Sequence, residues 1–219
     1  MIEGLLPPPA VSVETFEDVP GEPPFPGEQD LIARAVEGRR REFITARRCA
    51  RQALAGLGRP VTAIPAGPRR EPLWPDGVVG SITHCRGYRA AAVARRTDLA
   101  GLGIDAEPHG PLPAGVAGQV MLADEQDRLA GLAATHPGVP WDRLLFSAKE
   151  SVYKAWFPLT GRWLGFEEAR LSFDPAASAF HAEILVDGAR TDGGTPLSEL
   201  AGCYLIGRDL VLTAVTVGI

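Results

Sequence analysis

The sequence predicts an α+β protein built from two similar halves that divide near residue 107. A helix followed by strands occurs twice along the chain, which is the main evidence for two halves. The length of 219 residues suits one large domain or two small ones. With 45% hydrophobic residues, the chain can also bury a substantial core. Residues 1–107 and 108–219 show no residue-level repeat, so the division depends on the order of elements alone.

The sequence of the first half predicts one long helix and three strands. Residues 7–27 are rich in Pro and Gly and predict an irregular leader on the surface. Apolar residues at helical spacing predict a helix over 29–57, which the following glycines and Pro60 end. Three strand-like runs come after a proline-punctuated loop: 78–84, 88–94 and 102–107.

The second half repeats this order. A Gly/Pro-rich stretch over 108–118 leads into two predicted helices, 123–134 and 141–157. Four strand-like runs follow them: 170–173, 181–186, 203–206 and 210–217.

Charge is distributed unevenly along the chain. The net charge is −5, which argues against a dedicated nucleic-acid-binding protein. Between residues 34 and 51, however, seven arginines face only two glutamates: Arg34, Arg39, Arg40, Arg41, Arg47, Arg48 and Arg51. A basic segment on an otherwise acidic chain predicts a site for a small polyanion or an acidic partner.

Several classes of protein are disfavoured by the sequence. No apolar run approaches the ~18–20 residues of a membrane span, and the proline-broken N-terminus lacks the basic region of a signal peptide. Three widely separated cysteines indicate neither a disulfide framework nor a zinc pair. We therefore expect a cytoplasmic protein.

Two carboxylates alternate with apolar residues in the run 103–107. On a strand, Asp105 and Glu107 project to one face, while Ile104 and Ala106 face the core. Mg²⁺ binds such carboxylates together with phosphate oxygens and water. The same spacing also fits two solvated acids at the end of a strand.

Glu150 and Lys154 lie four residues apart in the predicted helix 141–157 and share one face of it. Such a pair is most often a surface salt bridge worth about 0.3–0.5 kcal/mol. Neighbouring aromatic residues, Phe146, Tyr153 and Phe157, make a fully solvated pair less expected here.

His84 and Cys85 are adjacent on a predicted strand and therefore point to opposite faces, which excludes a nucleophilic dyad. Cys85 is interpreted as a small core residue. His84, beside Thr83, is a candidate for binding phosphate and equally a candidate for a structural histidine.

Taken together, these runs resemble the signature of the 4′-phosphopantetheinyl transferases, of the monomeric surfactin-synthetase-activating and enterobactin type. The resemblance covers about residues 30–175. It is carried in order by 39–50 (RRREFITARRCA), 80–85 (GSITHC), 103–107 (GIDAE), 146–156 (FSAKESVYKAW) and 163–167 (WLGFE). Each motif is weak alone, but the ordered set is specific.

The resemblance implies two pseudo-symmetric α+β halves with the active site in the cleft between them. Residues 1–107 would contribute the arginine helix that binds coenzyme A phosphates, and 108–219 the catalytic helix. The implied reaction transfers 4′-phosphopantetheine from coenzyme A to a serine of apo carrier proteins, releasing adenosine 3′,5′-bisphosphate. The carriers would belong to fatty-acid, polyketide or nonribosomal-peptide synthases. The alternative is a non-catalytic coenzyme A- or nucleotide-binding regulator with the same fold.

Site roles follow from the resemblance, position by position. Asp105, Glu107 and Glu150 would hold Mg²⁺, or Mn²⁺. Glu150 would also take the proton of the carrier serine, with Lys154 keeping it ionised and stabilising the departing phosphate.

The coenzyme contacts implied by the resemblance are Arg39, Arg47 and His84, assisted by Thr83. At 100° per residue, Arg39 and Arg47 do not share one helix face, whereas Arg40 aligns better with Arg47. The family commonly has a lysine at the position of Ala66, which Arg69 or Arg70 would replace. Four apolar residues would either line the groove for the pantetheine arm or pack in the core: Phe146, Tyr153, Trp163 and Leu164.

Overall fold

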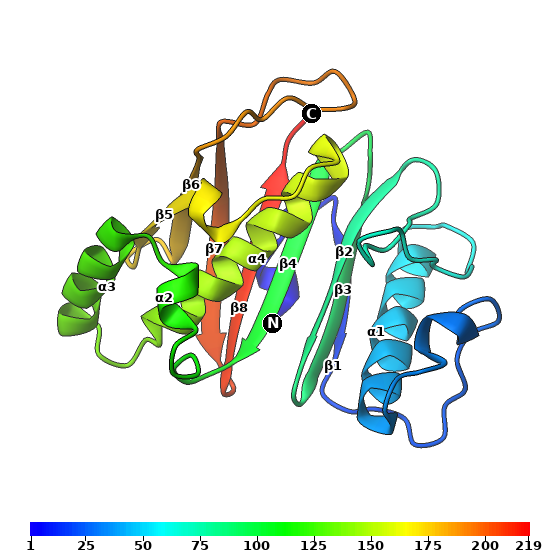
Figure 1. Ribbon diagram of the computed structural model, residues 1–219. Helices are drawn as coiled ribbons and strands as arrows, with labels where there is room; N and C mark the ends of the chain where they lie inside the picture. The colour runs from blue at the N-terminus through cyan, green and yellow to red at the C-terminus, as the bar shows by residue number, and fades with distance from the viewer.

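The computed structural model describes all residues from 1 to 219. Two antiparallel sheets lie side by side, and each is covered by one long helix (Figure 1). The α+β class with two halves that the sequence predicts is therefore confirmed, but residues 101–108 belong to the larger sheet rather than to the first half, in which the sequence analysis places the strand 102–107.

The smaller sheet contains three strands in the order β1-β3-β2. These strands are β1 (Val11–Thr15), β2 (Val78–Cys85) and β3 (Tyr88–Arg95). Helix α1 (Glu37–Gly56) packs on β3 and β1 with a face of Ala, Leu and Cys side chains.

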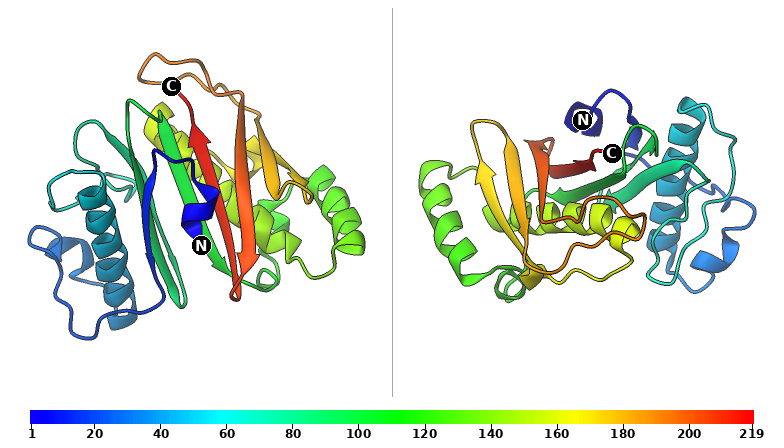
Figure 2. Two further views of the ribbon diagram at one scale, coloured as in Figure 1. Left: turned by 180° about the vertical axis from the view of Figure 1, so that it is seen from behind. Right: turned by 90° about the horizontal axis from the view of Figure 1, so that it is seen from above.

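The larger sheet has the order β4-β8-β7-β6-β5. Its strands are β4 (Gly101–Pro108), β5 (Ala169–Asp174), β6 (Ala179–Ile184), β7 (Glu199–Gly207) and β8 (Leu210–Val217). Helix α4 (Trp141–Thr160) crosses β4 and β8. Figure 2 shows the short helices α2 (Ala117–Val120) and α3 (Ala123–Thr135) beyond the start of α4, at one end of the molecule.

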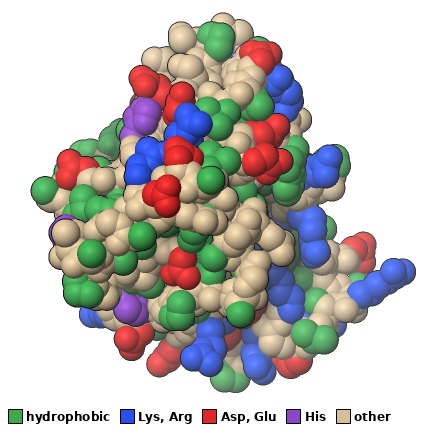
Figure 3. All heavy atoms as spheres, turned by 60° about the vertical axis from the view of Figure 1, so that its left-hand side comes forward, with side chains coloured by type: hydrophobic (Ala, Val, Ile, Leu, Met, Phe, Trp, Pro, Cys, Tyr) green, Lys and Arg blue, Asp and Glu red, His purple; other side chains and the backbone are tan.

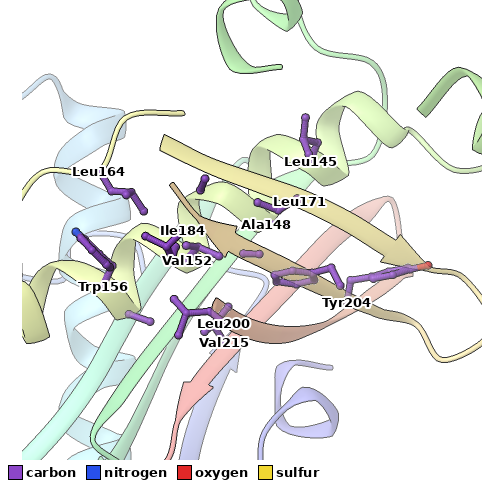
Figure 4. Close-up of a cluster of buried hydrophobic side chains, with 14 of the residues drawn as sticks. Leu145, Ala148, Val152, Trp156, Leu164, Leu171, Ile184, Leu200, Tyr204 and Val215 are labelled. Atoms are coloured by element: carbon purple, nitrogen blue, oxygen red, sulfur yellow. The ribbon is translucent and has the colours of Figure 1, made fainter. Parts of the chain in front are cut away.

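The largest hydrophobic cluster has 23 buried residues and lies between α4 and the larger sheet. Figure 4 shows Val152 of α4 near strand side chains, among them Ile184, Leu200 and Val215, and the ring of Trp156 directed toward Leu164. Because one face of α4 is committed to this core, its opposite face turns toward the smaller sheet.

Glycines let α4 approach β4 closely. A Cβ atom on Gly103 would lie 2.0 Å from the Ser151 carbonyl oxygen, and one on Gly101 would lie 2.9 Å from Leu159 Cδ1. Further along the same strand face, Asp105 meets Ser147 and Glu107 meets Arg143. A helix rises ~6 Å over four residues and a strand ~6.6 Å over two residues. Every fourth residue of α4 therefore lies opposite every second residue of β4 along the whole contact.

The two sheets meet where β2 lies beside β4. No backbone ladder joins these strands. Instead, the Ile104 amide donates to Ser81 Oγ at 3.1 Å, and Thr83 Oγ1 donates to Asp105 Oδ1 at 3.3 Å. On one face of the junction, polar side chains therefore surround a candidate metal ligand, while a buried hydrophobic cluster joins β2 and β3 to β4 and β8.

Two sequence-based predictions of local structure are wrong. The segment 7–27 is not wholly irregular, because its residues 11–15 form β1 and place Val11 and Val13 against the core under α1. The long helix does not begin at residue 29: a short 3₁₀ helix, η2 (Gln29–Ile32), comes first, and extended backbone at Val36 separates it from α1.

No helix of the structure combines the length and the apolar character that crossing a membrane requires.

Candidate active site

A cavity of about 690 Å³ lies between the two halves. The first half lines it with Arg39 and Arg47 of α1 and His84 of β2, and the second half with Glu150 and Lys154 of α4. Residues that are far apart in the sequence thus meet in one cavity, basic on one wall and mixed in charge on the other. Figure 3 shows basic side chains following one another down the right of the face it presents.

Arg47 is held rigidly in the wall of the cavity. Its side chain is buried, its Nε donates to the Ile64 carbonyl oxygen at 3.1 Å, and its guanidinium lies 4.0 Å from the Phe43 ring centroid. Burial lowers the pKa of Arg47 to about 10, so the side chain remains a cation at neutral pH.

Arg39 lies against His84. Its Nη1 is 3.2 Å from the imidazole Nδ1, and Glu42 Oε2 approaches both side chains at 3.5 Å. Burial, with Arg39, Lys154 and Arg89 nearby, lowers the pKa of His84 to about 3. His84 is therefore a neutral imidazole that lines the cavity beside Arg39.

The structure separates the two candidate arginines at the start of α1. Arg39 lines the cavity and Arg40 does not. Arg39 is near the beginning of the helix and its long side chain reaches back to His84, which overcomes the 80° offset from Arg47. On the loop after Ala66, Arg69 and Arg70 both line the cavity.

The basic wall rests on a buried ion pair that the sequence analysis missed. Arg51 Nη1 donates to both oxygens of Glu28 at 2.9 Å, and the Ile64 amide donates to Glu28 Oε1 at the same distance. Glu28 is fully buried although it lies in the Pro/Gly-rich segment. This pair fixes the backbone at Ile64, because Glu28 accepts from the Ile64 amide. The Ile64 carbonyl oxygen in turn accepts from Arg47.

Asp105 is the most heavily bonded carboxylate of the site. Oδ1 accepts from Lys154 Nζ at 2.6 Å and from Thr83 at 3.3 Å, while Oδ2 accepts from Ser147 Oγ at 2.9 Å. Ser147 is itself fixed by Thr213 of β8 at 3.0 Å. Donors on α4 and β2 therefore hold the Asp105 carboxylate in one orientation, and β8 supports it through Ser147.

Glu107 faces the same side of β4 and pairs with Arg143, whose Nη1 donates to Glu107 Oε2 at 2.8 Å. Burial and the charge of Asp105 raise the pKa of Glu107, and Arg143 opposes that shift.

Glu150 differs from these two carboxylates because it has no hydrogen-bond or ion-pair partner. Burial raises its pKa, as do the charges of Asp105 and Glu107, against the effect of Lys154. The predicted contact between Glu150 and Lys154 is wrong: the Lys154 ammonium bonds instead to Asp105 and, at 3.2 Å, to the Ile104 carbonyl oxygen. Glu150 is thus left free to accept a proton.

The donor set of these three residues fits a hard divalent cation. Carboxylate oxygens are the ligands Mg²⁺ prefers, and the mutual repulsion among the three residues would be relieved by such an ion. As the side chains stand, no three acidic, histidine or cysteine side chains converge into a complete metal cluster. Instead, Lys154 forms an ion pair with Asp105, and Arg143 forms one with Glu107.

The four apolar candidates for the pantetheine groove do not all lie at the cavity. Tyr153 lines the cavity and packs on Trp163 with ring centroids 4.9 Å apart, and Arg69 of the first half lies over the Trp163 ring at 5.8 Å. Leu164 is buried in the main core, and Phe146 packs on Phe166 at 5.8 Å. Of the four side chains only Tyr153 lines the cavity, and Phe146, Trp163 and Leu164 do not.

Sequence models of one enzyme family match both halves of the chain. The model of the 4′-phosphopantetheinyl transferase N-terminal domain matches residues 27–94, and that of the 4′-phosphopantetheinyl transferase superfamily matches residues 101–193. The chain belongs to the 4′-phosphopantetheinyl transferase family.

Characterised relatives resemble this transferase over almost its whole length. It is 54% identical to 4′-phosphopantetheinyl transferase Svp of Streptomyces mobaraensis, over 99% of this chain and 89% of the relative. It is 51% identical to Npt of Nocardia iowensis, over 98% of this chain and 99% of the relative. Enterobactin synthase component D of Salmonella typhi is more distant, at 34% identity over 65% of this chain and 58% of the relative.

These matches decide between the two functions that the sequence left open. The chain is a transferase that moves phosphopantetheine from coenzyme A to carrier proteins, rather than a non-catalytic regulator.

Proposed function

We propose that Glu150 is the general base of this transfer and that Asp105, Glu107 and Glu150 hold Mg²⁺, or Mn²⁺, at the coenzyme pyrophosphate. The observation that carries the proposal is the unpaired carboxylate of Glu150, which faces the cavity beside two carboxylates held by cations. When bound, the metal would neutralise charge on the leaving group.

The chain's own residues then have distinct tasks. Glu150 takes the hydroxyl proton of the carrier serine on a carboxylate oxygen, and its raised pKa suits a proton acceptor near neutral pH. Lys154, held 2.6 Å from Asp105, offers its ammonium to the departing phosphate. The second product of this transfer is adenosine 3′,5′-bisphosphate. Phosphoryl-type transfers depend mainly on such positioning and charge neutralisation.

We propose that Arg39 and Arg47 bind the 3′-phosphate of coenzyme A, with a hydrogen bond from His84. Arg69 or Arg70 would contact the adenine side, and Tyr153 with Trp163 would border the pantetheine arm. Thr83 acts indirectly in this proposal, because its hydroxyl is buried on Asp105. Phe146 and Leu164 shape the core behind these residues.

The carriers are proposed to be the acyl or peptidyl carrier proteins of fatty-acid, polyketide or nonribosomal-peptide synthases. We also propose that the enzyme acts as a monomer, because one chain contributes both walls of the cavity.

Metal dependence is the direct test of the proposed site. An apo carrier incubated with coenzyme A and Mg²⁺ is expected to gain the mass of one phosphopantetheine group, measured by mass spectrometry. EDTA should abolish the gain, and added Mg²⁺ or Mn²⁺ should restore it. Full activity in the chelator would contradict the metal assignment while leaving the transferase assignment intact.

The arginine wall predicts discrimination between coenzyme A and dephospho-coenzyme A. Each charge-assisted hydrogen bond contributes ~1.5–3 kcal/mol, so removal of the 3′-phosphate is expected to weaken binding at least about tenfold by calorimetry. Arg39→Ala should reduce this preference. Arg40→Ala is the matched control, since Arg40 does not line the cavity. Equal affinity of the wild-type enzyme for both compounds would show that the arginines bind something else.

A further inference from the structure

We propose that Arg143 is a positioning residue that fixes the carboxylate of Glu107 for metal binding. The proposal rests on the metal site proposed above and adds to it a residue that does not itself touch metal or substrate.

The guanidinium of Arg143 is held from several sides. Nη1 donates to Glu107 Oε2 at 2.8 Å, Nε to the Gly110 carbonyl oxygen at 3.2 Å, and Nη2 to the Pro111 carbonyl oxygen at 2.6 Å. Residues 110 and 111 directly follow β4, the strand that carries Glu107. Arg143 therefore ties the orientation of one side chain to the backbone immediately after it.

The contact belongs to the regular match between α4 and β4. Arg143, Ser147 and Ser151 lie at four-residue steps on the helix and meet Glu107, Asp105 and Gly103 at two-residue steps on the strand. Ser147 does for Asp105 what Arg143 does for Glu107, since each donates to one carboxylate oxygen. In Glu107 only Oε2 is bonded, which leaves Oε1 for a cation.

Glu107 needs this support more than Asp105 does. Asp105 has a short side chain, is 5% exposed and accepts from three side chains. Glu107 has a longer side chain near the end of the strand, and Arg143 is its sole hydrogen-bond partner. Without Arg143, Glu107 would have to be ordered by the metal itself. Loss of a residue that orients a ligand typically weakens metal binding 10–100-fold.

Mn²⁺ binding to the purified enzyme, followed by electron paramagnetic resonance without coenzyme or carrier, tests the inference. Arg143→Met is expected to bind Mn²⁺ about 10–100-fold more weakly than wild type. Arg143→Lys, which keeps a cation but cannot span the same three acceptors, should lie between the two. In turnover assays, Arg143→Met should raise the Mg²⁺ concentration needed for half-maximal rate far more than it lowers kcat at saturating Mg²⁺.

Asp142→Ala is the matched control for a purely structural effect. Asp142 Oδ2 accepts from the Leu112 amide and Oδ1 from the Arg143 backbone amide, both at 2.8 Å, so its loss loosens the same segment and the first turn of α4 while the Arg143 guanidinium keeps its bond to Glu107. This variant should lower the melting temperature and leave Mn²⁺ affinity unchanged.

Unchanged or tighter Mn²⁺ binding in Arg143→Met would overturn the inference, as would an equal loss of affinity in Asp142→Ala. If Arg143→Met does not fold, wild-type affinity in Arg143→Lys would overturn it instead. A wild-type enzyme that transfers phosphopantetheine but binds Mn²⁺ neither alone nor with coenzyme A would refute the metal site itself, and the positioning role with it.

Discussion

Glu150→Gln is expected to lower kcat by about 100-fold or more, because the amide keeps the shape of the side chain but cannot accept the serine proton. Coenzyme A affinity should stay close to that of the wild type, since Glu150 makes no hydrogen bond within the basic wall. The measurement is steady-state transfer to an apo carrier, combined with calorimetry of coenzyme A binding without metal, so that the proposed metal-ligand role of Glu150 does not enter the affinity.

Three further variants test whether the loss of turnover arises from Glu150 itself. Glu71→Gln removes another negative charge that lines the same cavity, and it should leave kcat near the wild-type value. Lys154→Ala should lower kcat, and the double variant with Glu150→Gln should be less harmful than the product of the single effects, since the two groups act in one step. A Glu150→Gln enzyme with near wild-type turnover would contradict the proposed base, although not the family.

Lys149→Met is expected to cost about 3–5 kcal/mol in the free energy of unfolding, because it breaks a buried ion pair on one side only. The Lys149 ammonium donates to Glu125 Oε2 at 2.8 Å and to the carbonyl oxygens of Val120 and Phe166 at 2.9 and 2.7 Å. These bonds join α4 to α2, α3 and the 3₁₀ helix η3 (Phe166–Glu168) that precedes β5, so their loss should be seen in urea unfolding.

A surface pair in the same region provides the control. Arg128 pairs with Asp124 across one turn of α3, and both side chains are exposed, so Arg128→Met should cost at most ~0.5 kcal/mol. An unfolding free energy for Lys149→Met within 1 kcal/mol of the wild type would show that the ion pair contributes little. Lys149 lies beside Glu150 in the sequence, and the contrast shows that neighbours within one motif can have separate tasks.

Local sequence patterns predicted most of the secondary structure. The 3.6-residue pattern of α4 was readable because one face of this helix is buried, and β2, β3 and β4 were readable as short strand-like runs that are buried along most of their length. The period of two along a strand placed Asp105 and Glu107 on one side of β4. Strand β1 was missed because prolines and glycines surround it and its partner β3 lies some 80 residues away in the register.

The sequence could not predict which side chains form hydrogen bonds and ion pairs with residues far away along the chain. The i,i+4 spacing of Glu150 and Lys154 indicated a pair, but a carboxylate on β4 competes for the same ammonium and is closer. Glu28 and Arg143 carry no local signal, since each acquires its role only when distant backbone atoms at residue 64 or 110 are brought to it.

The ladder between β4 and β8 also bears on the order in which this enzyme is assembled. Asp105 pairs with Thr213, more than 100 residues later, and the Thr213 hydroxyl supports the serine that holds Asp105. Pairings of such sequence separation form slowly because the intervening chain must first be ordered. During synthesis on the ribosome, α1 and the smaller sheet can therefore fold early, whereas the hydrogen-bonded surroundings of Asp105 are completed only after β8 has emerged. A nascent chain that has not reached β8 cannot yet consume coenzyme A.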